Sequence, residues 1–420
     1  MIDSSSEITL RKYATAVGLF GLLLIASTWK LWIPYSTFPA IPLFRWGCDV
    51  PQWVDGFLLA GISISLSAVV MTGLFNRWKT INYYSWLFFV LLITGAMVLN
   101  QHRIQTWAFQ FWVIGILYLL MSSRQRLFWL RWFVVSLYAY SAISKLDVSF
   151  TKETGGWLLE GLTSSIGQIT GLTTKYWSPS KIQTIAFMLP LSELAVAISL
   201  CIKRLGWWRI FPAIAMHLLL LLTFSPWGHL QNNGVLLWNC FFIAQVIILF
   251  GRNQPSILKQ NQQGDNSLRS RVGIVFILLL MTLPLLERTG WYDTWTSWAV
   301  YAGHPEQIII ELDSVALQKL PDEIQQQTQK NLNWTEDYSR LRIDRWALQS
   351  AGAPIYPESR FRVGVALFLA ERYHLNNGIR VRFRSTANRL TGKRSEQIYN
   401  GITEIKTFAN QFTLNSKPRG

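Results

Sequence analysis

Charged residues are scarce in this chain. They make up 15% of its 420 residues, while hydrophobic residues make up 50%. Ordinary soluble domains carry about 25% charged residues. This low fraction of charged residues argues against a soluble globular enzyme. It is typical of a protein with several membrane-spanning helices.

Cysteine is also rare. The three cysteines, Cys48, Cys201 and Cys240, lie far apart and form no Cys-x-x-Cys pair. A thiol redox motif and a zinc site therefore have no support, and we predict no bound metal. No small-residue cleavage pattern follows the first apolar run, so we expect this run to be a true span.

Acidic residues number 23 against 39 lysines and arginines, which gives a net charge of +16. The basic residues lie in short loops between apolar runs, where membrane topology explains them. We therefore predict no nucleic-acid partner. Internal repeats are not visible either, which disfavours a transporter built from repeated halves.

Long apolar runs, in contrast, are abundant, and 21 residues are tryptophan, which favours the membrane–water interface. A helical crossing takes about 17–25 residues. Nine runs approach that length: 14–33, 53–75, 82–100, 106–122, 127–147, 183–202, 207–224, 234–250 and 271–287. We predict a mainly α-helical, polytopic bundle of about nine spans in contact with membrane lipid.

The basic residues also orient the bundle. With a cytoplasmic N-terminus, the inside loops carry about twice as many lysines and arginines as the outside segments, as the positive-inside rule requires. Residues 1–288 then form the transmembrane domain. Residues 289–420 form a small extracytoplasmic α+β domain, with strands expected at 307–312 and 378–384 and a helix at 361–371. A bacterial inner membrane and an endoplasmic reticulum both fit this topology.

One cation stands at the end of the fifth run, in Tyr138-Ala-Tyr-Ser-Ala-Ile-Ser-Lys-Leu-Asp147. A lysine at membrane depth costs about 2.5–3.5 kcal/mol on insertion scales, so such residues usually serve a pathway or a reaction. Burial also disfavours the charged form of a lysine. We expect Lys145 to act as a general base. The alternative is a lysine that extends its amine to the headgroups.

Other polar residues share that depth. Asn100 and His102 end the third run, and His229 follows the seventh. We expect them to lie at the level of Lys145, where amide, imidazole and amine groups together bind a quinone oxygen or a carboxylate. The alternative for Asn100 and His102 is a helix end that satisfies its own backbone groups. His304 and His374 are expected to be ordinary surface residues.

A second polar layer lies deeper in the membrane. Glu193 precedes a hairpin turn by about ten residues, and His217 follows it by about eleven, so at roughly 1.5 Å per residue the two match in depth. We expect them to pair, because an isolated charge there is costly. The alternative is a purely structural interhelical hydrogen bond.

Four segments together carry a family resemblance. Residues 138–147 resemble the aromatic-x-x-Ala-Gly-x-Lys-Lys-Leu-Asp span of the vitamin K-dependent γ-carboxylases and their bacterial relatives, the horizontally transferred transmembrane domain (HTTM) proteins. Asn100-Gln-His102 is similar to their Asn-Asn-His. Glu193 and His217 are similar to the acidic residue and the histidine of a helical hairpin. Residues 283–301 resemble the last span and its tryptophan-containing exit.

The resemblance implies a reaction. In that family a lysine deprotonates vitamin K hydroquinone, oxygen adds, and a strongly basic alkoxide removes a γ-proton from a glutamate. The carbanion takes up carbon dioxide, and the quinone leaves as an epoxide. The expected cofactor is thus a reduced vitamin K-type naphthoquinone, with oxygen and carbon dioxide as co-substrates and a peptide or protein glutamate as partner. The implied catalytic residues are Lys145 and His102, and the implied cofactor-binding residues are Asn100, His217, Glu193 and His229.

The chain departs from the family in two places. Ser144 stands where the family has the first of two lysines, and the outer domain is much smaller. Two other functions therefore stay open. One is a DoxX-like, quinone-linked redox membrane subunit, which residues 100–107 also resemble. The other is a transporter or scaffold that uses Glu193 and His217 as a proton-coupled pair.

Overall fold

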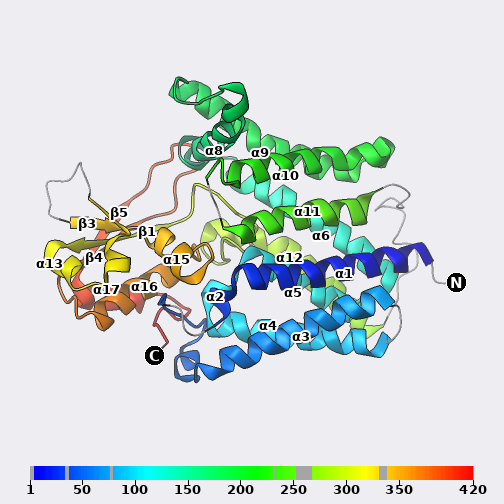
Figure 1. Ribbon diagram of the computed structural model, residues 1–420, viewed down its shortest axis with the longest axis horizontal. Helices are drawn as coiled ribbons and strands as arrows, with labels where there is room; N and C mark the ends of the chain where they lie inside the picture. The colour runs from blue at the N-terminus through cyan, green and yellow to red at the C-terminus, as the bar shows by residue number, and fades with distance from the viewer. Residues whose placement is uncertain are drawn as a thin grey trace.

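In the computed structural model, the helices lie side by side in one bundle, and a small sheet domain sits at one end of it (Figure 1). Helix α1 (Ser4–Ser27) begins at the end of the bundle opposite the sheet. Three of the basic residues that orient the chain, Arg77, Arg252 and Lys259, lie outside the described residues. The structure describes residues 4–33, 37–75, 79–229, 232–251, 267–330 and 338–419.

In these described ranges, eight helical segments are long and apolar enough to cross a membrane, which makes the chain a membrane protein by length and composition. They correspond to eight of the nine predicted runs. The segments are α1, α3 (Trp53–Phe75), α4 (Lys79–Leu99), α6 (Ser123–Lys145), α9 (Pro179–Cys201), η3 with α10 (Lys203–Ile210 and Phe211–Phe224), α11 (Asn233–Phe250), and α12 with η5 (Leu268–Thr282 and Leu283–Thr289).

The remaining predicted run, 106–122, forms the 15-residue helix α5 (Thr106–Leu120). At roughly 1.5 Å per residue it is about 22 Å long, short of a hydrocarbon core of about 30 Å. Most of its side chains are buried, so α5 is a core helix of the bundle. Short elements join the long helices: α2 (Trp29–Trp32), η1 (Arg45–Asp49), η2 (Gln101–Arg103), α7 (Val148–Lys152) and α8 (Thr154–Thr170).

Glycines allow α1 and α3 to pack closely, as small residues do between membrane helices. A Cβ atom on Gly73 would lie 2.3 Å from Thr15 Oγ1, and one on Gly18 would lie 2.7 Å from Val70 Cγ2. Larger side chains at either position would force the two helices apart. The same pair of helices is further joined by Arg11, which donates to the Gly73 carbonyl at 3.1 Å.

The C-terminal domain is built on a five-stranded antiparallel sheet in the order β2-β3-β1-β4-β5. The predicted strands at 307–312 and 378–384 and the predicted helix at 361–371 are confirmed as β1, β4 and α16. The strands are β1 (Gln307–Asp313), β2 (Thr328–Lys330), β3 (Tyr338–Leu341), β4 (Ile379–Arg384) and β5 (Glu396–Asn400). The helices are α13 (Ser314–Gln318), α14 (Asp322–Gln325), α15 (Ile343–Ala351), α16 (Ser359–Arg372) and α17 (Gly401–Ala409).

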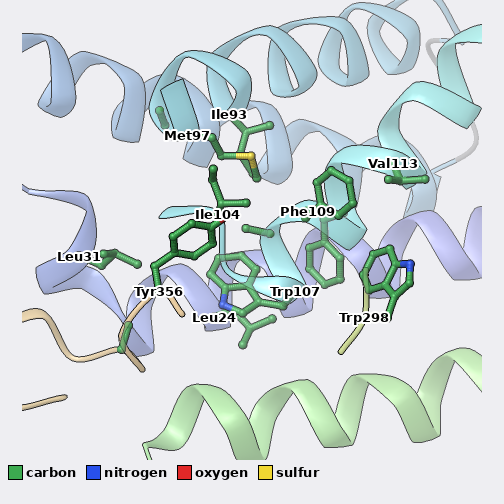
Figure 2. Close-up of a cluster of buried hydrophobic side chains, with 14 of the residues drawn as sticks. Leu24, Leu31, Ile93, Met97, Ile104, Trp107, Phe109, Val113, Trp298 and Tyr356 are labelled. Carbon is green, nitrogen blue, oxygen red and sulfur yellow. The ribbon is translucent and has the colours of Figure 1, made fainter. Parts of the chain in front are cut away.

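One continuous hydrophobic core joins the bundle to this domain. Figure 2 shows Trp298 and Tyr356, which follow the last long helix, among side chains of the bundle such as Trp107 and Phe109. The ring of Trp298 lies 5.4 Å from that of Phe109. Because these contacts are buried and aromatic, they fix the position of the C-terminal domain on the bundle.

A buried carboxylate ties the end of the described chain to its first third. Asp55 in the first turn of α3 is 2% exposed and accepts hydrogen bonds from Arg103 and, at 2.7 Å, from Nη1 of Arg419. Arg419 also donates to the Val50 and Pro51 carbonyls. Two guanidinium groups thus depend on one carboxylate for compensation of their charge.

We therefore expect Asp55→Asn to destabilise the protein by about 3–5 kcal/mol, since removing one partner of a buried pair leaves charge uncompensated. Thermal unfolding in detergent, followed by tryptophan fluorescence, measures this change. The control is Asp49→Asn, because Asp49 is exposed and surface substitutions cost at most about 0.5 kcal/mol. Equal melting temperatures for the two variants would show that the cluster contributes nothing to stability.

Candidate functional site

Lys145, the last residue of α6, is 3% exposed and forms an ion pair with Glu193 of α9. Its Nζ donates to Glu193 Oε1 at 3.0 Å and Oε2 at 2.9 Å. It also donates to Ser141 Oγ at 2.6 Å, because Ser141 lies one turn earlier on the same face of α6. The predicted base, Lys145, is therefore one partner of a carboxylate–amine pair. Its amine is both buried and paired with a negative charge.

His217 of α10 makes two side-chain hydrogen bonds, neither of them to Glu193. Asn239 Nδ2 donates to the Val235 carbonyl at 2.8 Å, so its Oδ1 faces His217 Nδ1, also at 2.8 Å. The Nδ1 atom thus donates, and a neutral imidazole then accepts the Tyr138 hydroxyl proton at Nε2, 2.9 Å away. The predicted Glu193–His217 pair is wrong, because each residue is engaged by a partner on another helix.

These groups nevertheless face one cavity inside the bundle, of about 80 Å³. We call it the Lys145 cavity. The depth match of Glu193 and His217 is therefore real, although the two side chains do not touch. The rest of the wall is largely aliphatic and aromatic, as in most small-molecule sites. The polar residues on the helices around it are Thr106, Tyr138, Ser141, Lys145, Glu193, His217 and Asn239.

The wall on the side of the C-terminal domain holds two strained residues. Trp298 and Tyr301 both line the Lys145 cavity and have positive φ angles of 64° and 62°. Left-handed backbone is an outlier for a bulky side chain and costs on the order of 1–3 kcal/mol. Such strain persists where the surroundings impose it, and it clusters at functional sites. Trp298, Val300 and Tyr301 thus form the wall of the cavity on this side.

Asn100 and His102 lie elsewhere, contrary to the expectation of one cluster with Lys145. They line a different cavity, of about 280 Å³. Asn100 Oδ1 accepts from the His102 backbone at 3.0 Å, and His102 Nε2 donates to the Pro354 carbonyl at 2.8 Å. Burial lowers the pKa of His102 to about 4, despite this hydrogen bond. His102 is thus a neutral side chain that joins the bundle to the C-terminal domain.

His229 is also separate from the Lys145 cavity. Its ring stacks on Trp157 at a centroid distance of 4.1 Å, and its Nε2 donates to the Trp157 carbonyl at 2.5 Å. Gly161 makes room for it, since a Cβ atom there would lie 2.3 Å from His229 Cδ2. These contacts hold the turn after α10 against α8, so the structure gives His229 a packing role.

The sequence interpretation missed a buried charge cluster beside Lys145. His304, expected on the surface, is fully buried and bridges two carboxylates. Its Nδ1 lies 3.2 Å from Asp147 Oδ2, and its Nε2 lies 2.8 Å from Glu287 Oε1. Arg288 adds a contact of 3.5 Å to Asp147. Asp147 ends the 138–147 motif, so the only signal available in the sequence was an acidic residue at a membrane boundary that needs a cationic partner.

Hydrogen bonds set the charge state of this cluster. Burial by itself would lower the pKa of His304, but the hydrogen bonds to Asp147 and Glu287 outweigh it and raise that pKa above its ordinary value of 6.5. Burial would likewise raise the pKa of Asp147, and the hydrogen bonds from His304, Phe150 and Ser149 lower it overall. The imidazolium form of His304 is thus bound between two carboxylates.

No family model matches the chain, and neither a curated protein nor a solved structure is significantly similar to it. The γ-carboxylase resemblance therefore rests on the short sequence segments alone.

The raised pKa of His304 predicts a pH-dependent stability. Its bound proton stabilises the fold fully below pH 6.5, and this contribution is lost as the pH rises through the raised pKa. At pH 6, we expect His304→Asn to cost about 3 kcal/mol, because two buried carboxylates lose their shared partner. The loss should shrink at alkaline pH. Melting temperatures of the wild type and of His304→Asn, measured from pH 6 to alkaline pH, test this expectation.

The matched control is His374→Asn, since His374 is exposed in the C-terminal domain. This variant should keep the pH dependence of the wild type. If His304→Asn and the wild type lose stability in parallel as the pH rises, the proton on His304 does not stabilise the fold.

Proposed function

We propose that the protein is an integral membrane enzyme with γ-carboxylase-like chemistry. It acts on a reduced vitamin K-type quinone at the Lys145–Glu193 pair and couples oxygenation of the quinone to carboxylation of a glutamate-like acceptor. One observation carries the proposal: a buried amine–carboxylate pair lies on the wall of an apolar cavity between membrane helices. Ionisable residues at such depth mark functional sites by default, and a lipid-soluble cofactor needs a site that it can reach from the membrane.

The residues of the Lys145 cavity fit the head group of such a cofactor. Leu158, Phe224 and Phe242 offer apolar and aromatic surfaces for ring faces, beside the polar groups of the same cavity. Ligand pockets usually measure about 300–1,000 Å³, so the cavity of about 80 Å³ must widen for a naphthoquinone. Trp238 is one of the side chains that this cavity shares with a neighbouring cavity of about 180 Å³, so the added volume can come from movement of that shared wall.

Two pairs of side chains in the cavity can hold or transfer a proton. In the ion pair, the acceptor with free lone pairs is the Glu193 carboxylate, and transfer of a proton from Lys145 Nζ to Glu193 Oε2 over 2.9 Å frees the amine. In the same cavity, the Tyr138 hydroxyl faces His217 Nε2, and Asn239 fixes the orientation of that imidazole. When bound there, a quinol would be oxidised by oxygen, and carbon dioxide would supply the carbon of the new carbon–carbon bond.

The departure at Ser144 changes this site less than the sequence indicates. Ser144 Oγ donates to the Ser141 carbonyl at 2.9 Å and so satisfies its own helix. The second charged group beside the amine is instead Glu193, from a different helix. The transporter alternative loses its main support, because the Glu193–His217 pair on which it depended does not form. A DoxX-like redox subunit would bind a quinone in the same cavity but would carboxylate no glutamate-like acceptor.

We also propose that the N-terminus is cytoplasmic and that the C-terminal domain is extracytoplasmic. Support comes from the basic loops and from the position of the sheet domain, which lies at the end of the bundle opposite the start of α1 (Figure 1).

The purified protein should convert a reduced naphthoquinone and oxygen into the quinone epoxide, detected by mass spectrometry. Loss of a general base typically costs 10²–10⁴-fold in rate, so we expect Lys145→Met to lower epoxide formation by about that factor. The matched control is Lys152→Met, because Lys152 is exposed on α7 and should be dispensable.

Lys145→Met leaves the Glu193 carboxylate unpaired, so the double variant Lys145→Met/Glu193→Gln is assayed alongside it to preserve the fold. Epoxide formation at the wild-type rate in the double variant would rule out the pair as the base. An absence of epoxide from the wild type with several naphthoquinones would remove the quinone chemistry itself.

A further inference from the structure

Two further cavities continue from the Lys145 cavity toward the C-terminal domain. The first, of about 180 Å³, shares wall residues with the Lys145 cavity, among them Thr106, Val300 and Tyr301. We call it the middle cavity. The second, of about 340 Å³, lies against the sheet and shares Trp295, Tyr301 and Arg362 with the middle cavity. We call it the outer cavity. Each cavity therefore shares part of its wall with the next.

Tyr301 is common to all three walls. Its ring stacks on Phe224 at 5.2 Å, and its hydroxyl forms no hydrogen bond with any residue of the described chain. Its backbone is held at a positive φ of 62°. Because the side chain of Tyr301 is held by ring contacts alone, it can rotate without breaking a hydrogen bond. A movement of Tyr301 would connect the outer cavity with the Lys145 cavity.

Two arginines, Arg340 and Arg362, line the outer cavity and can donate hydrogen bonds into it. Arg362 makes only a 3.5 Å contact from Nε to the Tyr356 carbonyl, and Arg340 forms no side-chain hydrogen bond or ion pair within the described ranges. The acidic residues of the same wall are already engaged. Asp344 accepts from Arg342 at 2.8 Å, and Glu306 accepts from Ser359 at 2.7 Å. Both guanidinium groups interact electrostatically with Asp344, but neither donates a hydrogen bond to a carboxylate of the described chain, so their N–H groups are available to a ligand.

A guanidinium group matches a carboxylate in shape and charge, because its parallel N–H groups meet both oxygens. We propose that the outer cavity binds a water-soluble ligand through its carboxylate, with Arg340 and Arg362 as anchors. This ligand reaches the Lys145 cavity past Tyr301. A lipid-soluble cofactor reaches the same cavity from the membrane, so the two partners arrive by different routes. The route deepens the proposed function, but it stands on the cavities and their charge rather than on the reaction.

Thiol labelling tests this route without any enzymatic assay. The background protein carries Cys48→Ser, Cys201→Ser and Cys240→Ala, which removes the free cysteines. Thr106→Cys then places one thiol on the wall shared by the Lys145 and middle cavities. Two methanethiosulfonates of similar size are compared, one with a sulfonate and one with a trimethylammonium group. The measured quantity is the ratio of their labelling rates in the detergent-purified protein.

We expect the anionic reagent to label Thr106→Cys the faster of the two, because charged clefts raise local counter-ion concentration and association rates by 10–10³-fold. Adding Arg362→Gln should lower the anion-to-cation ratio about tenfold, while Arg362→Lys should keep most of it. Tyr301→Ala should accelerate both reagents. The control thiol, Thr170→Cys, lies on the exposed end of α8 and should show no change in the ratio with any of these substitutions.

The ligand class is tested by protection of the same thiol. N-acetylglutamate should slow labelling of Thr106→Cys in the background without other cysteines. This protection should be lost when Arg340→Gln and Arg362→Gln are added. Protection by inorganic phosphate but not by the carboxylate would overturn the ligand assignment. A ratio that is unchanged by Arg362→Gln, or rates that are unchanged by Tyr301→Ala, would overturn the route. Since no quinone is present, these outcomes do not depend on whether epoxide is formed.

Discussion

The ion pair between Lys145 and Glu193 is the constraint around which the bundle is arranged. Each charge is costly to bury alone, and each compensates the other at 2.9 Å. The pair joins α6 to α9 and leaves the neighbouring wall apolar, so a cavity with one reactive edge forms between the helices. Ser141 and Tyr138 stand on the same face of α6 as Lys145, one and two turns before it. One helix face thus carries the amine and both of these hydroxyl groups.

Much of this site could be predicted from the sequence, because a polar residue in an apolar run is conspicuous. Lys145, Glu193 and His217 all stood out for that reason, and all three line the Lys145 cavity. Their partners could not be predicted. Distance from a turn gives the depth of a residue in the membrane but not the direction in which its side chain points around the helix. Glu193 and His217 match in depth, yet they face different neighbours, Lys145 and Tyr138.

The residues at helix ends show the same limit. Asn100 and His102 were placed at the correct end of their helix, but the Pro354 carbonyl, more than 250 positions later, decides the side-chain contact of His102. His304 was missed because no local pattern marks it, and its burial follows from Asp147 and Glu287 closing around it. The long helices were predictable from hydropathy and length. The short helix α5 passed the same hydropathy criterion because interior burial and lipid contact demand the same apolar residues.

The ion pair also has a consequence for how the protein is made. Glu193 follows Lys145 by 48 positions, so α6 leaves the ribosome well before its partner exists. At about 5–20 residues per second, the lysine waits about 2–10 s for its counter-charge. During that interval the end of α6 has no compensating carboxylate from α9, and a single span with an uncompensated cation partitions poorly into lipid. Biogenesis of this protein therefore requires that α6 be sheltered by the insertion machinery, or held at the membrane surface, until α9 arrives.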